Sequence, residues 1–194
     1  MLIGIHGRIG HGKDTVADFL MELNPLFEKH KFANFLKEFC AKLIGCDVSD
    51  FESQEFKNTS LPSEWDVDGR PMLVRELLQR AGTEGGRIGI HPDVWVNTTL
   101  RDYRSDLHWV VSDVRFPNEA DRIKKLGGYL VKVVRETLPR PSHEHESETA
   151  LDSYDKWDYI IYNNYDMEAL QDTVDVMYNG VINAEQKKQT ERSI

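Results

Sequence analysis

A glycine-rich segment near the start of the chain constrains its fold more than any other feature. Residues 2–6 are mainly branched apolar side chains, and the segment GRIGHGK follows directly, from Gly7 to Lys13. A strand, a glycine loop and a helix in this order are the context of a phosphate-binding loop, and the segment matches the pattern G-x-x-x-x-G-K. The helix is predicted from apolar residues that recur at helical spacing, namely Val16, Phe19, Leu20 and Leu23.

Glycines suit such a loop because their backbone N–H groups can point at phosphate oxygens without obstruction by side chains. The first turn of the following helix adds unpaired N–H groups and a partial positive charge, and Lys13 can reach the β- and γ-phosphates. The alternative is a β–α turn that binds no ligand. We expect a nucleotide-phosphate site made of Gly7, Gly10, His11, Gly12, Lys13, Asp14 and Thr15.

The loop departs from the usual pattern at Asp14, where a Ser or Thr hydroxyl normally binds Mg²⁺. Asp14 could hold the ion directly or through water, and Thr15 is available for the α-phosphate. The sequence therefore predicts a nucleotide site and leaves its metal geometry open.

The composition excludes several classes of protein. With 194 residues, 40% of them hydrophobic, the chain can form one domain with a real core. Its net charge of −9 argues against a protein that coats nucleic acid. No stretch approaches the ~20 apolar residues of a membrane span. The N-terminus enters a strand directly, and Cys40 and Cys46 fit reduced core thiols, so we expect a soluble, cytoplasmic protein with no membrane partner.

The segment after the first helix predicts a second strand over residues 28–33 and a helix over 34–44, capped by Asn34. Lys37 would lie in the first turn of that helix, beyond the carboxyl end of a strand, where open α/β sheets bind ligands. The alternative is a solvated surface lysine. The buried side of this helix is expected to carry Phe35, Leu36, Phe39 and Leu43.

Residues 47–105 are expected to form an inserted, largely helical acceptor-binding region. Residues 47–70 show no periodicity and suit a lid or binding loop, in which Trp65 is more simply an anchor on the core than a platform for a base. Helices are predicted over 71–81 and 92–103, with a sharp turn between them. This turn could merely end the first helix, but it also offers a flexible backbone with a carboxylate, a hydroxyl and the Arg87 guanidinium together.

A strand over residues 108–114 ends in Asp113, which resembles a Walker B carboxylate beside nucleotide-bound Mg²⁺. The alternative is a carboxylate that hydrogen-bonds locally. A helix from about 116 to 127 and a strand over 129–135 follow.

Residues 136–148 are polar and broken by proline, and they occupy the position of a short lid. Arg135 and Arg140 are its candidate arginines, whereas a metal site at His143 and His145 lacks further His or Cys ligands. A fifth strand over 157–162, a helix over 167–182 and a frayed tail over 183–194 complete the chain. Alternating strands and helices predict a parallel sheet covered by helices on both faces.

Several motifs together resemble the bacteriophage deoxynucleoside monophosphate kinases, which belong to the P-loop nucleoside monophosphate kinase superfamily. The resemblance spans about residues 2–182 and rests on GRIGHGKDT, FANFLKE, RELLQRAGTEGGR with HPDVWV, VVSDVRFPNEAD, and HESE followed by DYIIYN. It implies a P-loop kinase fold with a five-stranded parallel sheet, in a single domain over residues 1–194. It also implies phosphorylation of a dNMP to a dNDP with ATP and Mg²⁺.

Carried over residue by residue, the resemblance implies catalytic roles for Lys13, Arg135 and Arg140, which would stabilise the transferring phosphoryl group, and for Asp113 as the Walker B carboxylate. It implies that Asp14 and Asp113 lie at Mg²⁺, directly or through water. It also implies that the acceptor-binding part includes Lys37, Arg75, Arg87, Asp93 and Trp95. The acceptor phosphate would attack the γ-phosphate in line. Two alternatives stay open: a P-loop kinase for another small phosphorylated acceptor, such as dephospho-coenzyme A or phosphomevalonate, and a non-catalytic ATP-binding module. A nucleic-acid end kinase is disfavoured by the acidic charge, and a homodimer is possible.

Overall fold

The computed structural model describes residues 1–138 and 146–192 of the chain, so Arg140, His143 and His145 lie outside the described residues. The chain forms two compact units, one made of Met1–Lys31 with Asp102–Ile194 and the other of Phe32–Arg101. The second unit thus begins at Phe32, earlier than the insertion expected from residue 47.

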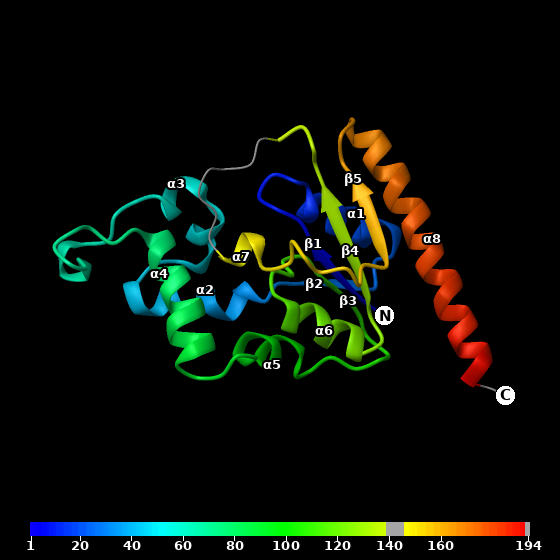
Figure 1. The fold of residues 1–194 in the computed structure, drawn as a ribbon, viewed down its shortest axis with the longest axis horizontal. Helices are drawn as coiled ribbons and strands as arrows, with labels where there is room; N and C mark the ends of the chain where they lie inside the picture. The colour runs from blue at the N-terminus through cyan, green and yellow to red at the C-terminus, as the bar shows by residue number, and fades with distance from the viewer. Residues whose placement is uncertain (139–145, 193–194) are drawn as a thin grey trace. The chain divides into compact units, whose positions relative to one another are not determined.

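The first unit contains a five-stranded sheet in which every neighbouring pair is parallel, as predicted (Figure 1). The strand order is β2-β3-β1-β4-β5, so the strand that leads into the glycine loop lies at the centre. All carboxyl ends therefore lie at one edge of the sheet. The strands are β1 (Leu2–His6), β2 (Phe27–His30), β3 (His108–Val111), β4 (Tyr129–Val134) and β5 (Tyr159–Tyr162).

Helices pack on both faces of this sheet, because strand side chains alternate between the faces. On one face, Ile3 and Ile5 of β1 pack in a buried core with residues of α1 (Lys13–Leu23) and α8 (Met167–Arg192). The other face carries α6 (Pro117–Lys125). A Cβ on Gly4 of β1 would lie only 2.5 Å from Cδ1 of Ile123 in this helix. Glycine at position 4 therefore lets α6 approach the central strand closely.

The final helix continues beyond its predicted end, and the expected frayed tail over 183–194 is wrong up to Arg192. Side chains of this extension pack against the rest of the first unit. Tyr129 Oη donates to Glu185 Oε1 at 2.8 Å, and Lys188 Nζ lies 4.2 Å from the centre of the Tyr129 ring. The sequence did not predict these contacts, because this part of the chain is rich in charged residues and has no apolar stripe. No helix in the part of the chain that the structure describes is long and apolar enough to cross a membrane.

The second unit is helical and has its own core of buried side chains, which includes Cys40, Phe51 and Leu77, with Trp65 packed against it. Trp65 is therefore an anchor, as the simpler interpretation predicted. Its elements are α2 (Ala33–Ile44), the short 3-10 helices η1 (Val48–Glu52) and η2 (Ser63–Trp65), α3 (Gln54–Lys57), α4 (Val74–Arg80), η3 (Ala81–Ile88) and α5 (Val94–Leu100).

Two predictions for α2 are wrong. Its N-cap residue is Phe32 rather than Asn34, and no side chain caps the helix. Phe39 and Leu43, expected on the buried side, are 51% and 44% exposed, whereas Lys37, Cys40 and Ala41 are buried. The buried face of α2 is thus rotated about the helix axis relative to the face that carries its largest apolar side chains.

The sharp turn predicted after α4 is instead a π-helix, η3, which continues α4. Its wider turn is shown by the Gly89 N–H, which donates to Glu84 O at 2.9 Å, five residues back. Trp95 fixes this turn, because its indole Nε1 donates to Gly82 O at 2.9 Å. A Cβ on Gly86 would lie 2.7 Å from the Trp95 ring, so only glycine fits beneath the indole.

Burial of His6 at the end of β1 makes the stability of the first unit depend on pH. His6 is 4% exposed, Nδ1–H donates to Val114 O at 2.8 Å, and the ring stacks on Trp157. Burial lowers the pKa of His6 from 6.5 to about 4. Between these pH values the unfolded chain binds a proton that the folded chain does not, so stability falls as pH drops through this window.

We expect His6 to account for a loss of up to about 2 kcal/mol in the free energy of unfolding between pH 7 and pH 5. The variant His6→Asn keeps a donor for Val114 O but cannot titrate. Its unfolding free energy, measured by denaturant titration at both pH values, should fall by less than that of the wild type. Equal losses in the two proteins would contradict the assignment.

Candidate phosphate-binding site

The glycine loop has the backbone conformation of an anion-binding loop. Gly10 and Gly12 have φ angles of 80° and 93°, in the left-handed region that favours glycine. Helix α1 begins directly at Lys13, and no side chain caps its N-terminus. The first N–H groups of this helix therefore remain available to an anion.

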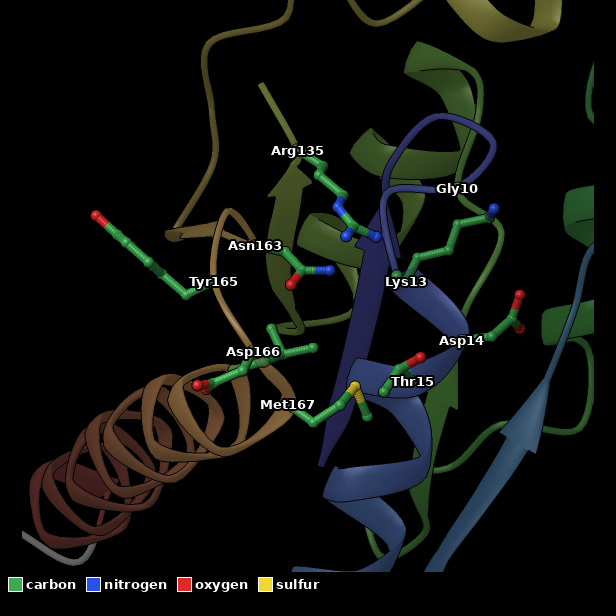
Figure 2. Close-up of a pocket in the computed structure, with 11 residues that line it drawn as sticks. Gly10, Lys13, Asp14, Thr15, Arg135, Asn163, Tyr165, Asp166 and Met167 are labelled. Carbon is green, nitrogen blue, oxygen red and sulfur yellow. The ribbon is translucent and has the colours of Figure 1, made fainter. Parts of the chain in front are cut away.

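This loop opens into a cavity of about 590 Å³ in the first unit. Figure 2 shows its lining, with the Arg135 side chain extending from the end of β4 toward the glycine loop. The cavity brings together six residues predicted from the sequence and five that were missed. The predicted six are Gly10, Gly12, Lys13, Asp14, Thr15 and Arg135, and the missed five are Asn163, Tyr165, Asp166, Met167 and Leu170.

Lys13 supplies a cation at the cavity under opposing influences. Burial lowers its pKa, and the nearby positive charge of Arg115 acts in the same direction, whereas Asp14, Glu148 and Asp113 act to raise it. Asp113, the predicted Walker B carboxylate, is 6% exposed and lies close enough to influence Lys13. Extra negative charge from bound phosphates would favour the protonated lysine.

Arg115 is a cation near the loop that the sequence-based site did not include. It is ion-paired with Glu148, which belongs to α7 (Glu146–Thr149). Although burial disfavours its charge, Glu148 and Asp113 hold the pKa of Arg115 above its usual value. Arg115 belongs to the motif DVRFPNE, which was noted in the sequence, but its pairing with Glu148 could be seen only in the structure.

Asp14 carries a carboxylate that is ionised and half exposed. Its Oδ1 accepts a hydrogen bond from Ser112 Oγ at 3.1 Å and lies 3.1 Å from Lys31 Nζ and 3.5 Å from Lys29 Nζ. Burial acts to raise the pKa of Asp14, but the bond to Lys31 and the charges of the lysines outweigh it and lower the pKa. All three of these contacts involve Oδ1.

The donor set suits Mg²⁺, which prefers oxygen ligands and usually takes one or two carboxylates, with phosphate oxygens and water completing the shell. Asp14 supplies an ionised carboxylate beside the Ser112 hydroxyl, and Asp113 is a second carboxylate near Lys13. Within residues 1–138 and 146–192, no three His, Cys, Asp or Glu side chains gather into a metal site. A divalent ion here would therefore bind together with the phosphates.

Arg135 follows β4 and provides unused hydrogen-bonding capacity. Its Nε is buried and has no hydrogen-bond partner in the described part of the chain. A buried donor of this kind is costly unless a ligand or water completes it. Arg135 thus lies in the lining of the cavity, and the catalytic role predicted for it stays a prediction.

His11 and Gly7 contact the end of β4 instead of the cavity. The His11 Nδ1 lies 3.2 Å from Val133 O and 3.3 Å from the backbone N of Arg135. One nitrogen cannot donate to the carbonyl and accept from the amide at once, so the tautomer decides which bond forms. Burial lowers the pKa of His11, which favours the neutral ring.

The segment after β5 forms the side of the cavity that the sequence did not reveal. Tyr165 and Met167 are 77% and 58% exposed, and both line the cavity with Leu170 of α8. Exposed aromatic and thioether side chains can pack against a flat ring. The motif DYIIYN was noted in the sequence, but its spacing carried no chemical pattern that pointed to a site.

The predicted acceptor residues all belong to the second unit. Lys37 Nζ lies 2.5 Å from Glu52 Oε1, so Lys37 is buried and paired rather than solvated. Arg75 donates to Asn58 and Gln54. Around η3 and the start of α5, Arg87 donates to Pro92 O at 3.2 Å, Asp93 precedes the first turn of α5, and Trp95 bonds Gly82 O.

Comparison with known proteins identifies relatives along most of the chain. A family model described as deoxynucleotide monophosphate kinase matches residues 46–174. A mimivirus protein (Acanthamoeba polyphaga mimivirus) assigned as a deoxynucleotide monophosphate kinase is 36% identical over 183 residues, covering 87% of this chain and 91% of that protein. The deoxynucleoside-5'-monophosphate kinase of Escherichia phage T5 is 24% identical, covering 87% of this chain and 97% of that protein.

Among solved structures, TT1252 from Thermus thermophilus covers 93% of this chain with 18% identity and a TM-score of 0.47.

We expect Asp14→Asn to raise the Mg²⁺ concentration needed for tight ATP binding by about tenfold, the lower end of the effect of perturbing a metal's ligand environment. The control is Asp18→Asn, because Asp18 also pairs with Lys29, at 2.7 Å, but is not among the cavity-lining residues. Titration of a fluorescent ATP analogue with Mg²⁺ measures both. Equal shifts in the two variants would show that Asp14 acts only through the lysines.

Proposed function

We propose that this chain, which belongs to the deoxynucleotide monophosphate kinase family, transfers the γ-phosphoryl group of ATP to a deoxynucleoside monophosphate. The observation that carries the ATP assignment is the cavity in which the glycine loop, Lys13 and the buried Arg135 donor converge. A catalytic role rather than passive binding is supported by Arg135, because arginine forks suit a transferring phosphoryl group.

On the donor side, the N–H groups of the loop and of the first turn of α1 bind the phosphates, and Lys13 neutralises their β and γ charges. The Tyr165–Met167 side of the same cavity receives the base, where contacts are apolar and aromatic. Asp14 and Asp113 would hold Mg²⁺, which supplies positive charge to the triphosphate when bound. Arg135, with its unsatisfied Nε, stabilises charge that develops during transfer.

The reaction asks little base chemistry of the protein. The acceptor phosphate has a second pKa of about 6, so at neutral pH it is already a nucleophile. Its oxygen attacks the γ-phosphorus as the bond to the bridging oxygen of ADP breaks. Positioning and charge neutralisation are therefore the main contributions of the side chains.

On the acceptor side, we assign the monophosphate to the second unit, with Arg87 as its anchor. Arg87 lies on η3, and π-helical turns frequently occur at functional sites. Its guanidinium donates to Pro92 O at 3.2 Å, and its planar fork of N–H donors suits a phosphate group. Trp95 has a structural role, because its bond to Gly82 O holds the π-helical turn on which Arg87 lies. Asp93 lies after this turn, at the start of α5.

The proposed activity is tested by incubating the purified protein with ATP, Mg²⁺ and each common dNMP and NMP, and then resolving the diphosphates. We expect dNDP formation, and its loss by at least about a hundredfold in Lys13→Ala, in line with removal of one transition-state charge contact. Thermal unfolding of the variant should stay close to that of the wild type. Turnover of dephospho-coenzyme A or phosphomevalonate, but of no dNMP, would reject this acceptor class.

We expect Arg87→Lys to raise the KM for the dNMP by about tenfold and to leave the KM for ATP nearly unchanged, because lysine keeps the charge but loses the fork. Arg80→Lys is the matched control, since Arg80 is an exposed arginine of the neighbouring α4 that pairs with Glu76 at 3.0 Å. Equal shifts for both substrates, or the same effect in the control, would remove Arg87 as the acceptor anchor.

A further inference from the structure

Two consecutive asparagines after β5 connect separate parts of the site in the first unit. Asn163 is 8% exposed, its backbone N–H donates to Val134 O at 2.7 Å, and its side-chain Nδ2 donates to His11 O at 3.0 Å. This one residue therefore links the end of β4 to the glycine loop. Neither residue was predicted to have a function, and the ATP site proposed above does not require the link.

Asn164 makes the corresponding link to the chain that follows Arg135. Its Oδ1 accepts a hydrogen bond from the backbone N–H of Glu136 at 2.9 Å, and its Nδ2 donates to Glu136 Oε2 at 2.8 Å. The two neighbouring amides thus hold different partners. Asn163 holds the loop, and Asn164 holds the residue next to Arg135.

The bond from Asn163 fixes the direction of one peptide in the glycine loop. In a trans peptide the C=O and the following N–H point in opposite directions. Because His11 O is held toward Asn163, the N–H of Gly12 must point away from it. A Cβ on Gly12 would lie 2.5 Å from Asn163 Nδ2, so the amide packs directly against the loop and leaves little room for that peptide to rotate.

We propose that Asn163 is a positioning residue that orients the His11–Gly12 peptide, and so fixes the direction of the Gly12 N–H in the phosphate-binding loop before any ligand binds. This inference rests on the proposed function only for the identity of the ligand, because the orientation is a property of the free protein. Asn164 acts in the same way on the chain after Arg135. Such preorganisation improves affinity by reducing the ordering that binding requires.

The competing explanation is direct contact, because Asn163 also lines the cavity. Backbone ¹⁵N relaxation of the nucleotide-free protein separates the two. In Asn163→Ala we expect the order parameters of residues 11–13 to fall from the rigid level of about 0.85 to below about 0.6. Asn163→Asp preserves the shape but removes the donor, so it should show the same fall. Asn164→Ala should leave residues 11–13 rigid and loosen Glu136.

ATP binding by calorimetry then gives the functional consequence. Positioning predicts that Kd rises about fivefold to tenfold in Asn163→Ala, the size of one net hydrogen bond. A higher Kd with unchanged order parameters would overturn the proposal in favour of direct contact. Loosening of residues 11–13 in Asn164→Ala would overturn the division between the two amides. If the wild type bound no ATP, the proposed function would fail while the relaxation result still decided the positioning role.

Discussion

The structure of the site depends on the backbone of the seven-residue glycine loop, which is held at the carboxyl edge of the central strand. Two glycines in the left-handed region let the chain turn, and neighbouring strand ends restrain it through Gly7, the His11 ring and the His11 carbonyl. Because strand order places β1 between β3 and β4, the loop is flanked by Asp113 on one side and Arg135 on the other. The parallel sheet therefore acts as the scaffold that aligns donors from distant parts of the sequence.

Charge around this loop is balanced locally, although the whole chain is acidic. Three cations near the loop have a carboxylate close by: Arg115 has Glu148, and Lys29 and Lys31 have Asp14. Such pairs let several positive groups sit near one another before a phosphate arrives. Burial, reinforced by Arg115, lowers the pKa of Lys13, so a bound anion would favour the protonated form of this lysine.

The sequence predicted the sheet and the loop correctly because their signals are local and strong: apolar runs for the strands, and glycine spacing followed by lysine for the loop. It failed where tertiary packing decides. The extension of α8 depends on Glu185 and Lys188 meeting Tyr129, and the π-helix depends on Trp95 lying over Gly86. Asn163 and Tyr165 line the cavity because β5 ends beside the glycine loop. No residue spacing in the sequence predicts that β5 and the loop are neighbours. The roles assigned to Lys37, Arg75, Asp93 and Arg140 stay predictions.

The proposed transfer from ATP to a dNMP requires that the chain bind both nucleotides at the same time. The most direct measurement is the Kd of an analogue in which adenosine and a deoxynucleoside are joined through five phosphates, compared with the Kd of ATP and of the dNMP alone. Our account predicts that the linked compound binds at least about a hundredfold more tightly than ATP, because the second site is engaged intramolecularly. Binding no tighter than that of ATP alone would contradict it.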